Sequence, residues 1–220
     1  MQEEDGFLLQ ISQKLLKRPL SLAGAEPLVP DWMPDVPFID PPAPAAVLIS
    51  LVARPGGRTI IYTQRSAALR AHSGQIAFPG GKIDASDVDA GATALREAHE
   101  EVGLELSGAK ILGYMPPYQT GTNYVITPVV AAVCQRGRLV PNPNEVDEVF
   151  EVPLEFIMDK ENYGRFLVTR PGREHSSWML DFDGHIIWGI TAHLTRKFRK
   201  MILGEPDWPE PDWPDKEGAR

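Results

Sequence analysis

The chain has 220 residues, of which 43% are hydrophobic, so it is long enough to bury one substantial core. Its formal net charge of -8 disfavours a broad nucleic-acid or anionic-membrane surface, so we expect neither nucleic acid nor a membrane as a partner. Cys134 is the only cysteine, which excludes an intramolecular disulfide and favours a reducing, cytoplasmic setting.

The N-terminal segment predicts an amphipathic helix over Gly6 to Lys17. We expect this helix to pack on the folded domain rather than to contact a membrane or a partner. The acidic start over Glu3 to Asp5 argues against a signal peptide, and no stretch reaches the roughly 20 apolar residues of a membrane span. The apolar positions of the helix are Phe7, Leu8, Ile11, Leu15 and Leu16.

Proline dominates the next segment. Seven prolines between Pro27 and Pro44 exclude a regular helix and predict an extended linker or the edge of a lid. The sequence therefore divides into an N-terminal helix and linker over residues 1–44, a folded domain over residues 45–203, and an acidic tail over residues 204–220.

Two strands are predicted to open the domain. The apolar run Ala45 to Ala53 indicates a buried strand, Pro55 to Gly57 a turn, and Thr59 to Arg65 a second strand that completes a hairpin. A basic loop follows over Arg65 to Gly74. Such a loop is often only solvated surface, but its place directly before an acidic cluster favours phosphate binding, because arginine can hold a phosphate through two hydrogen bonds.

A helix is predicted over Ala90 to Val102. The segment holds mostly good helix formers and no proline, and Gly103 follows where a C-capping glycine belongs. Leu95, Ala98 and Val102 recur at helical spacing and form an apolar stripe. The opposite side of this helix is therefore open to polar residues.

Three carboxylates share that opposite side, because Glu97, Glu100 and Glu101 lie at positions i, i+3 and i+4. Their repulsion destabilises the helix unless a cation lies among them. Hard divalent ions such as Mg²⁺ or Mn²⁺ prefer oxygen ligands and bridge to substrate phosphates. A solvated acidic face is the alternative, but Gly80 and Gly81 predict a tight turn whose backbone can approach an ion or a pyrophosphate.

Two more strands are predicted downstream, over Ala109 to Met115 and Tyr124 to Cys134. Pro128 places the second of them at a sheet edge or a bulge. Cys134 ends an apolar run and is expected to be a buried, inert thiol. The aromatic loop Tyr114 to Tyr124 either stacks on an adenine or caps the core, and the sequence favours neither.

The C-terminal part predicts a hairpin over Trp178 to Trp188, turning at Asp183-Gly184, and a final helix to about Leu203. The motif EPDWP then occurs twice over Glu205 to Pro214, in a tail expected to be extended. The tail tryptophans can dock on the domain, on a partner or on a second subunit, so a homodimer stays an open alternative.

The stretch Gly81 to Leu104 resembles the Nudix box, G-x5-E-x7-R-E-x-x-E-E-x-G followed by an apolar residue. Two departures are visible: Asp87 stands where the box has its first glutamate, and the interval from Gly81 to Arg96 is one residue longer than the general pattern. The matching positions are Gly81, Arg96, Glu97, Glu100, Glu101, Gly103 and Leu104.

This resemblance implies an α/β fold, the Nudix α/β/α sandwich around a mixed β-sheet. It implies that Mg²⁺ or Mn²⁺ is held by Glu97, Glu100 and Glu101 with the carbonyl of Gly81. It also implies that Arg96, placed to pair with Glu100 at i+4, orients the glutamates. An activated water would then attack a pyrophosphate, and a carboxylate would accept its proton.

The identity of that proton acceptor stays open. Glu100 and Glu101 are candidates within the box. The segment Asn144 to Leu154 resembles the family's E-V-x-x-x-F-E-V-P-L element, which implies a further candidate, Glu145 or Glu148. Ordinary surface carboxylates are the alternative for this pair.

The segment Tyr62 to Gly81 resembles the signature L-T-x-R-S-x-x-L-R-x-H-x-G-x-V-x-F-P-G-G of the coenzyme A pyrophosphatase branch of this family. A longer first turn of the box is usual in that branch, so the extra residue supports it. The resemblance implies hydrolysis of coenzyme A to adenosine 3′,5′-bisphosphate and phosphopantetheine. It implies substrate contacts from Arg65, Arg70, His72 and Gly80.

Two other functions share these residues. A hydrolase of another nucleoside diphosphate derivative, such as ADP-ribose or NADH, would need the same box. A Nudix-fold binding module without catalysis is disfavoured, because Arg96 and all three glutamates of the R-E-x-x-E-E element are present.

Overall fold

The computed structural model describes residues 5–20, 41–69, 72–120, 123–170 and 173–205. Its centre is an eight-stranded sheet in which the path β3-β2-β1-β7-β5 carries β4 beside β1, β6 beside β7 and β8 beside β2. The pairing of β1 with β7 is parallel and the others are antiparallel, so the sheet is mixed. The strands are β1 (Ala43–Arg54), β2 (Gly57–Arg65), β3 (Ile76–Ala77), β4 (Gly80–Lys82), β5 (Ala109–Tyr114), β6 (Tyr118–Gln119), β7 (Tyr124–Val133) and β8 (Val146–Pro153).

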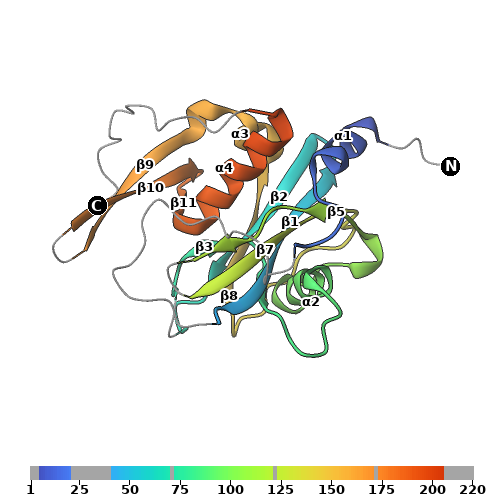
Figure 1. Ribbon diagram of the computed structural model, residues 1–220, viewed down its shortest axis with the longest axis horizontal. Coiled ribbons are helices and arrows are strands. Elements are labelled where there is room, and N and C mark those ends of the chain that lie inside the picture. The colour runs from blue at the N-terminus through green and yellow to red at the C-terminus, as the bar shows by residue number, and fades with distance from the viewer. Residues whose placement is uncertain (1–4, 21–40, 70–71, 121–122, 171–172, 206–220) are drawn as a thin grey trace.

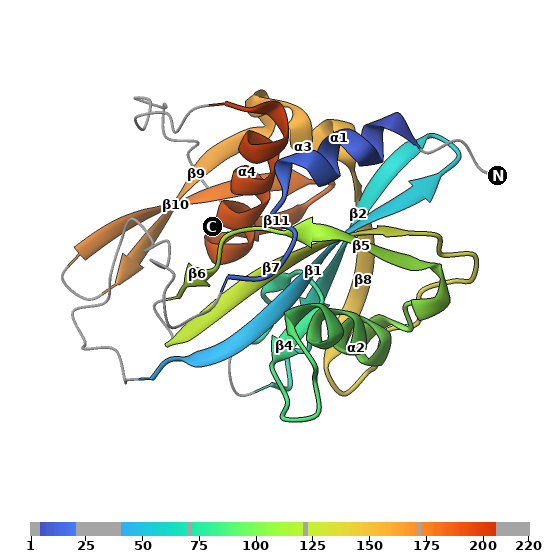
Figure 2. The same ribbon diagram turned by 45° about the vertical axis from the view of Figure 1, so that its right-hand side comes forward.

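Helices cover both faces of this sheet (Figures 1 and 2). Helix α2 (Ala90–Val102) lies on one face, and α1 (Gly6–Lys14) and α4 (Gly189–Leu203) lie on the other. A second, antiparallel sheet of β9 (Tyr163–Arg170), β10 (Arg173–Phe182) and β11 (His185–Trp188) packs beside α4. Three short helices complete the described elements: α3 (Leu154–Met158), η1 (Leu106–Gly108) and η2 (Lys160–Asn162). The expected α/β sandwich around a mixed sheet is confirmed.

Strand β1 supplies both hydrophobic cores. Successive side chains of a strand point to opposite faces, so Ala46 and Leu48 face α2 whereas Ile49 and Leu51 face the α4 side. All four are fully buried. A strand covered on both faces is apolar throughout, which is why Ala45 to Ala53 could be identified as a buried strand from its sequence.

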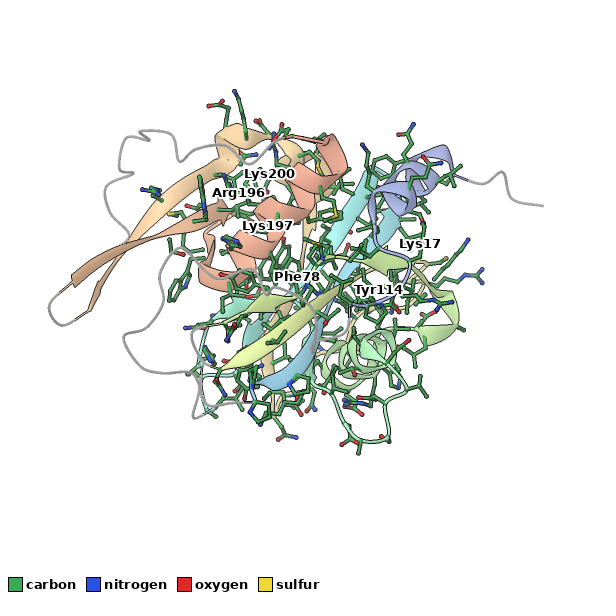
Figure 3. The ribbon with its side chains drawn as sticks, in the orientation of Figure 1. Lys17, Phe78, Tyr114, Arg196, Lys197 and Lys200 are labelled. Atoms are coloured by element: carbon green, nitrogen blue, oxygen red, sulfur yellow. The ribbon has the colours of Figure 1, made fainter. Side chains whose placement is uncertain are left out.

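The N-terminal helix ends earlier than predicted, at Lys14. The chain then turns to extended backbone, and Leu16 exchanges two hydrogen bonds of 2.9 Å with the backbone of Tyr114 on β5. Figure 3 labels Tyr114 and the neighbouring Lys17 at this junction. Ile11 and Leu15 are buried, so the expectation that this segment packs on the domain is confirmed.

Pro128 was predicted to mark a sheet edge or a bulge. It lies in an interior strand, so the edge was wrong, but the pairing of β5 with β7 is irregular nearby, between Ile111 and Gly113. Strand β7 has β1 on one side and β5 and β6 on the other. Pro128 faces the interruption between β5 and β6, where the amide of Met115 donates to its carbonyl at 3.0 Å. A missing amide donor is tolerated where a neighbouring strand is already broken.

Two further expectations concern the aromatic loop and the thiol. Within the loop, Tyr118 is 1% exposed and packs against the ring of His193, so this tyrosine belongs to the core. Cys134 is exposed, so the expectation of a buried thiol was wrong. The residue follows the last residue of β7, where the chain leaves the sheet.

The C-terminal hairpin turns at Asp183 and Gly184, which both adopt positive φ, and α4 starts directly after it, both as predicted. Residues 21–40 and 206–220, which hold most of the predicted linker and tail, lie outside the described residues. Among the described helices, none has the length and apolar character needed to cross a membrane.

Candidate active site

Helix α2 begins and ends at local capping signals. The side chain of Asp89 accepts a hydrogen bond of 2.9 Å from the amide of Ala92, and Gly103 closes the helix in the left-handed conformation with φ 67°. Ala94 and Ala98 are fully buried against the sheet. These contacts fix the rotation of the helix and therefore the direction of its glutamates.

The three glutamates differ sharply in burial. Side-chain exposure is 51% for Glu100, 16% for Glu97 and 4% for Glu101. The sequence placed all three opposite the apolar stripe, but only Glu100 is on a solvated face. Strand β4 lies over the other two, and the amide of Gly80 donates to Glu101 Oε2 at 3.1 Å.

Gly80 and Gly81 form strand β4 rather than the predicted tight turn, and neither adopts positive φ. Their role is close approach. A Cβ at Gly80 would collide with the carbonyl of Ala46, and a Cβ at Gly81 would lie 2.5 Å from the carboxylate of Glu97. Glycine is therefore required here because the backbone of β4 lies directly against β1 and α2.

Arg96 pairs with the carboxylates of α2, as expected. It also pairs with Asp87, the residue that stands in place of the first glutamate of the box. Its Nε and Nη2 donate to the two oxygens of Asp87 at 3.0 Å each. Its Nη1 lies 2.9 Å from both Glu97 and Glu100. The Arg96 guanidinium holds the pKa of Asp87 well below its usual range, and the bond to Asp87 raises the pKa of Arg96.

Burial raises the pKa of two of these glutamates. Desolvation raises the pKa of Glu101 to about 8. The hydrogen bond from the amide of Gly80 and the charge of Arg65 act in the opposite direction. Desolvation also raises the pKa of Glu97, although its pair with Arg96 opposes the shift. The charge of Glu145 adds to both increases, so three carboxylates interact across this small region.

Glu145 lies near enough to the helix glutamates for its charge to affect their pKa. The carbonyl of Glu145 accepts from the amide of Ser66 at 2.9 Å, and the amide of Asn142 donates to the carbonyl of Glu101 at 2.8 Å. Glu148 lies elsewhere: its carboxylate pairs with His185 at 3.2 Å. Glu145 precedes β8, whereas Glu148 lies within it beside the C-terminal hairpin.

The basic loop reaches the same site through Arg65. Its Nη1 lies 4.0 Å from Glu101 Oε1, and its buried Nε has no hydrogen-bond partner. His72 is exposed and bonds Gln75 at 2.9 Å, so it borders the loop without contacting the glutamates. Arg70 lies outside the described residues.

The side chains offer the chemistry of a site for a hard divalent ion, with carboxylate oxygens that repel one another near a glycine backbone. These side chains are not arranged as a complete set of metal ligands in the described part of the chain. Within the described ranges, no group of three or more histidine, cysteine, aspartate or glutamate side chains is arranged to hold a metal ion. Arg96 contacts one oxygen of Glu97 and one oxygen of Glu100.

Comparison with known proteins agrees with this geometry. The model of the NUDIX domain matches residues 42–169. A relative from Photorhabdus laumondii, named uncharacterized Nudix hydrolase NudL, is 38% identical over 158 residues, covering 72% of this chain and 84% of the relative. The NudL protein of Escherichia coli K12 is 39% identical over 162 residues, covering 74% and 84%.

A solved structure shares the fold. The crystal structure of RenU, a Nudix hydrolase from M. smegmatis, superposes with a TM-score of 0.51 and covers 76% of this chain and 90% of that chain. The two sequences are 19% identical, so this likeness concerns the fold alone.

Proposed function

The chain belongs to the Nudix family, and from that membership we propose that it is a metal-dependent pyrophosphohydrolase that cleaves coenzyme A or its derivatives. The family supports hydrolysis of a nucleoside diphosphate derivative, and the R-E-x-x-E-E element of the box is complete in this sequence. The products would be adenosine 3′,5′-bisphosphate and phosphopantetheine, or its acylated form.

The observation that carries the proposal is the meeting of Glu97, Glu101 and Glu145 next to Arg65. The charge of Glu145, just before β8, adds to the raised pKa of Glu97 and of Glu101 on α2, which supports a shared site. A guanidinium lies at its border. An acidic cluster beside a phosphate-binding cation suits a substrate that arrives with its own negative charge and with a divalent ion.

Glu97, Glu100 and Glu101, with the carbonyl of Gly81, would hold Mg²⁺ or Mn²⁺. When bound, the ion would neutralise the pyrophosphate and lower the pKa of the attacking water. The chain's own residues then have three tasks. Arg96, fixed by Asp87, orients Glu97 and Glu100; Arg65 binds a phosphate oxygen; and a carboxylate accepts the proton from the attacking water.

Glu100, Glu101 and Glu145 are the candidates for that proton acceptor. Glu145 differs from the other two because it lies outside α2, in the turn before β8, so its removal should leave the box geometry intact. A Glu145→Gln variant that retains Mn²⁺ affinity but loses turnover would assign the role to Glu145. Loss of Mn²⁺ affinity in Glu145→Gln would instead identify Glu145 as a metal ligand.

The preference for coenzyme A rests on the segment Tyr62 to Gly81. The structure connects this segment to the site at both ends: Arg65 borders Glu101, and Gly80 donates to the same carboxylate. The loop between them is fixed to β8 by the bond from Ala67 to Asp147 at 2.8 Å. Two described residues of the segment that resembles the coenzyme A signature, Arg65 and Gly80, therefore lie next to Glu101, which supports a role of this segment in substrate binding.

The experiment that tests the substrate is product analysis by mass spectrometry after incubation with coenzyme A, ADP-ribose, NADH and a dinucleoside polyphosphate, each with Mg²⁺ or Mn²⁺. We expect phosphopantetheine as the dominant product. Hydrolysis of only the other substrates would retain the metal chemistry and reject coenzyme A. Tight binding of a substrate without any metal-dependent product would reject catalysis.

A further inference from the structure

A second charged cavity lies at the other end of strand β1 from the carboxylate site. Strand β4 pairs with Ala46 near the start of β1, whereas the cavity begins at Arg54, its last residue. A strand rises about 3.3 Å per residue, so these positions are about 25 Å apart along β1. The cavity has a volume of about 540 Å³ and is lined by Arg54, Arg136, Gly137, Arg138, Leu139, Val149, Phe150 and Glu151.

The side chain of Arg54, which lines this cavity, is held in place by three hydrogen bonds. Its Nε and Nη2 donate to the two oxygens of Glu151 at 2.9 and 2.5 Å, and its Nη1 donates to the carbonyl of Gln135 at 3.0 Å. All three nitrogen atoms are therefore engaged, and Glu151 neutralises the charge. The bond to Gln135 also anchors the chain immediately before Arg136.

Arg136 and Arg138 supply the positive charge that is not neutralised in this way. Both are exposed, and neither forms an ion pair or side-chain hydrogen bond with another described residue. Between them, the amide of Gly137 donates to Glu105 Oε1 at 2.7 Å, which holds the bend that carries both arginines. Two guanidiniums beside one cavity are unusual in a chain of net charge -8.

The remaining apolar surface comes from Leu139 and Val149, which pack in the same core cluster. Phe150 turns its ring to the other face of the sheet, where it stacks on His185. The cavity is open to solvent, and its volume lies within the range of sites for small molecules. Guanidinium groups bind phosphate through paired hydrogen bonds. We propose that this cavity is a second anion site that binds a small organic phosphate, with the phosphate on Arg136 and Arg138 and an apolar or aromatic body against Leu139 and Val149.

The segment that lines the cavity continues to the carboxylate site. The amide of Val140 donates to the carbonyl of Val102 at 2.9 Å, and the amide of Asn142 donates to the carbonyl of Glu101 at 2.8 Å. An occupant that orders Arg136 to Leu139 therefore acts on a segment already bonded to the C-terminal turn of α2. We therefore expect the NMR signal of the Asn142 amide to shift when the cavity is occupied.

The test is a titration followed by site-resolved ¹H–¹⁵N NMR, in EDTA so that no divalent ion supports phosphate binding at the glutamates. The probes are inorganic phosphate and phenyl phosphate. We expect saturable shifts of the amides of Gly137, Leu139 and Asn142, with phenyl phosphate binding at least about threefold more tightly because its ring covers apolar surface.

Variants distinguish binding by Arg136 and Arg138 from a general effect of removing positive charge. Arg136→Ala with Arg138→Ala should weaken phenyl phosphate binding at these amides at least about tenfold. The matched control Arg18→Ala removes an exposed arginine outside the cavity and should leave it unchanged. Replacement of both arginines by lysine should give an intermediate affinity, since the charge is retained and the paired geometry is lost.

Two results would overturn the proposal. One is the absence of saturable shifts at Gly137 and Leu139 in the wild-type protein, including the case in which shifts occur only around Arg65. The other is an equal affinity in the wild type and in the double alanine variant. Neither readout depends on turnover, so the outcome is independent of the proposed hydrolase activity.

Discussion

The amide of Gly80 donates a hydrogen bond to the carboxylate of Glu101, which joins a two-glycine strand to the box helix at the centre of the site. This bond stabilises the ionised form of a side chain that burial otherwise holds protonated. The same carboxylate lies 4.0 Å from Arg65, so a backbone amide and a guanidinium both act on it.

Gly81→Ala should lower kcat by about 10- to 100-fold, because its Cβ would displace the carboxylate of Glu97 from its place beside β4. The control is Gly56→Ala, since a Cβ there meets nothing within 4 Å and φ is not positive. Steady-state kinetics with the best substrate of the panel, alongside thermal unfolding, gives the answer. Equal kcat in the two variants would show that the approach of Gly81 to Glu97 is unimportant.

Asp87→Asn should lower kcat by about tenfold or more, because Arg96 would lose the charge that fixes it between Glu97 and Glu100. The pKa of Asp87 is lower in the folded protein than in the unfolded chain, where it is about 3.9. The ionised side chain therefore stabilises the fold at pH values above about 3.9, and this stabilisation is lost as the pH falls further. The variant should consequently show a flatter loss of stability in acid.

The control for this variant is Glu155→Gln, which removes an exposed carboxylate on α3. Thermal unfolding between pH 2 and pH 7 and kinetics at neutral pH measure both effects. A wild-type acid profile and wild-type kcat in Asp87→Asn would contradict the role of Asp87.

Glu101 should make the metal-free protein less stable as pH rises. Its pKa is raised from 4.5 to about 8 in the folded state, so the folded protein binds more protons than the unfolded chain between these values. The free energy of unfolding therefore falls with rising pH across this window. Glu101→Gln removes the effect and should unfold at least about 2 °C above the wild type at pH 8.5 in EDTA, with the gain shrinking toward pH 5.

The measurement is a series of thermal unfolding curves from pH 4.5 to pH 9. Saturating Mn²⁺ should reverse the order of the two proteins, because only the wild type retains the full ligand set. A stability difference that does not change with pH would contradict the buried, protonated state of Glu101.

Arg65→Ala should raise KM for coenzyme A about tenfold, because the guanidinium beside Glu101 would no longer bind a phosphate oxygen. Arg65→Lys should recover part of the loss by restoring the charge. Arg18→Ala serves again as the exposed control. An unchanged KM in the alanine variant would remove Arg65 from the substrate site.

Local signals explain what the sequence could predict. Helix α2 begins and ends at the predicted residues because its caps, Asp89 and Gly103, are encoded in the segment itself. The hairpin at Asp183-Gly184 follows for the same reason, since both residues accept positive φ. The pairing of Arg96 with Glu100 was likewise set by helical spacing.

The errors concern contacts between segments distant in the chain. Whether Gly80 and Gly81 form a turn or a strand depends on β1, which begins nearly forty residues earlier, and no local signal reports that pairing. Pro128 in an interior strand depends on a break in its neighbour. The burial of Glu101 depends on β4, so helical spacing placed the residue opposite the apolar stripe but could not predict that it is buried.

The pair of Asp87 with Arg96 was not predicted. The sequence showed Asp87 only as a departure from the box, because aspartate is one carbon shorter than the expected glutamate. The structure shows both oxygens of Asp87 within 3.0 Å of Arg96, so the shorter side chain reaches its partner.

The most direct test of the account is the metal-dependent cleavage of coenzyme A by the wild type and by Glu101→Gln, each checked for folding by circular dichroism. The account predicts phosphopantetheine from the wild type and a kcat at least about 100-fold lower in the variant, with the fold intact. A near-normal kcat in Glu101→Gln would contradict the assignment of these glutamates as the metal and catalytic site.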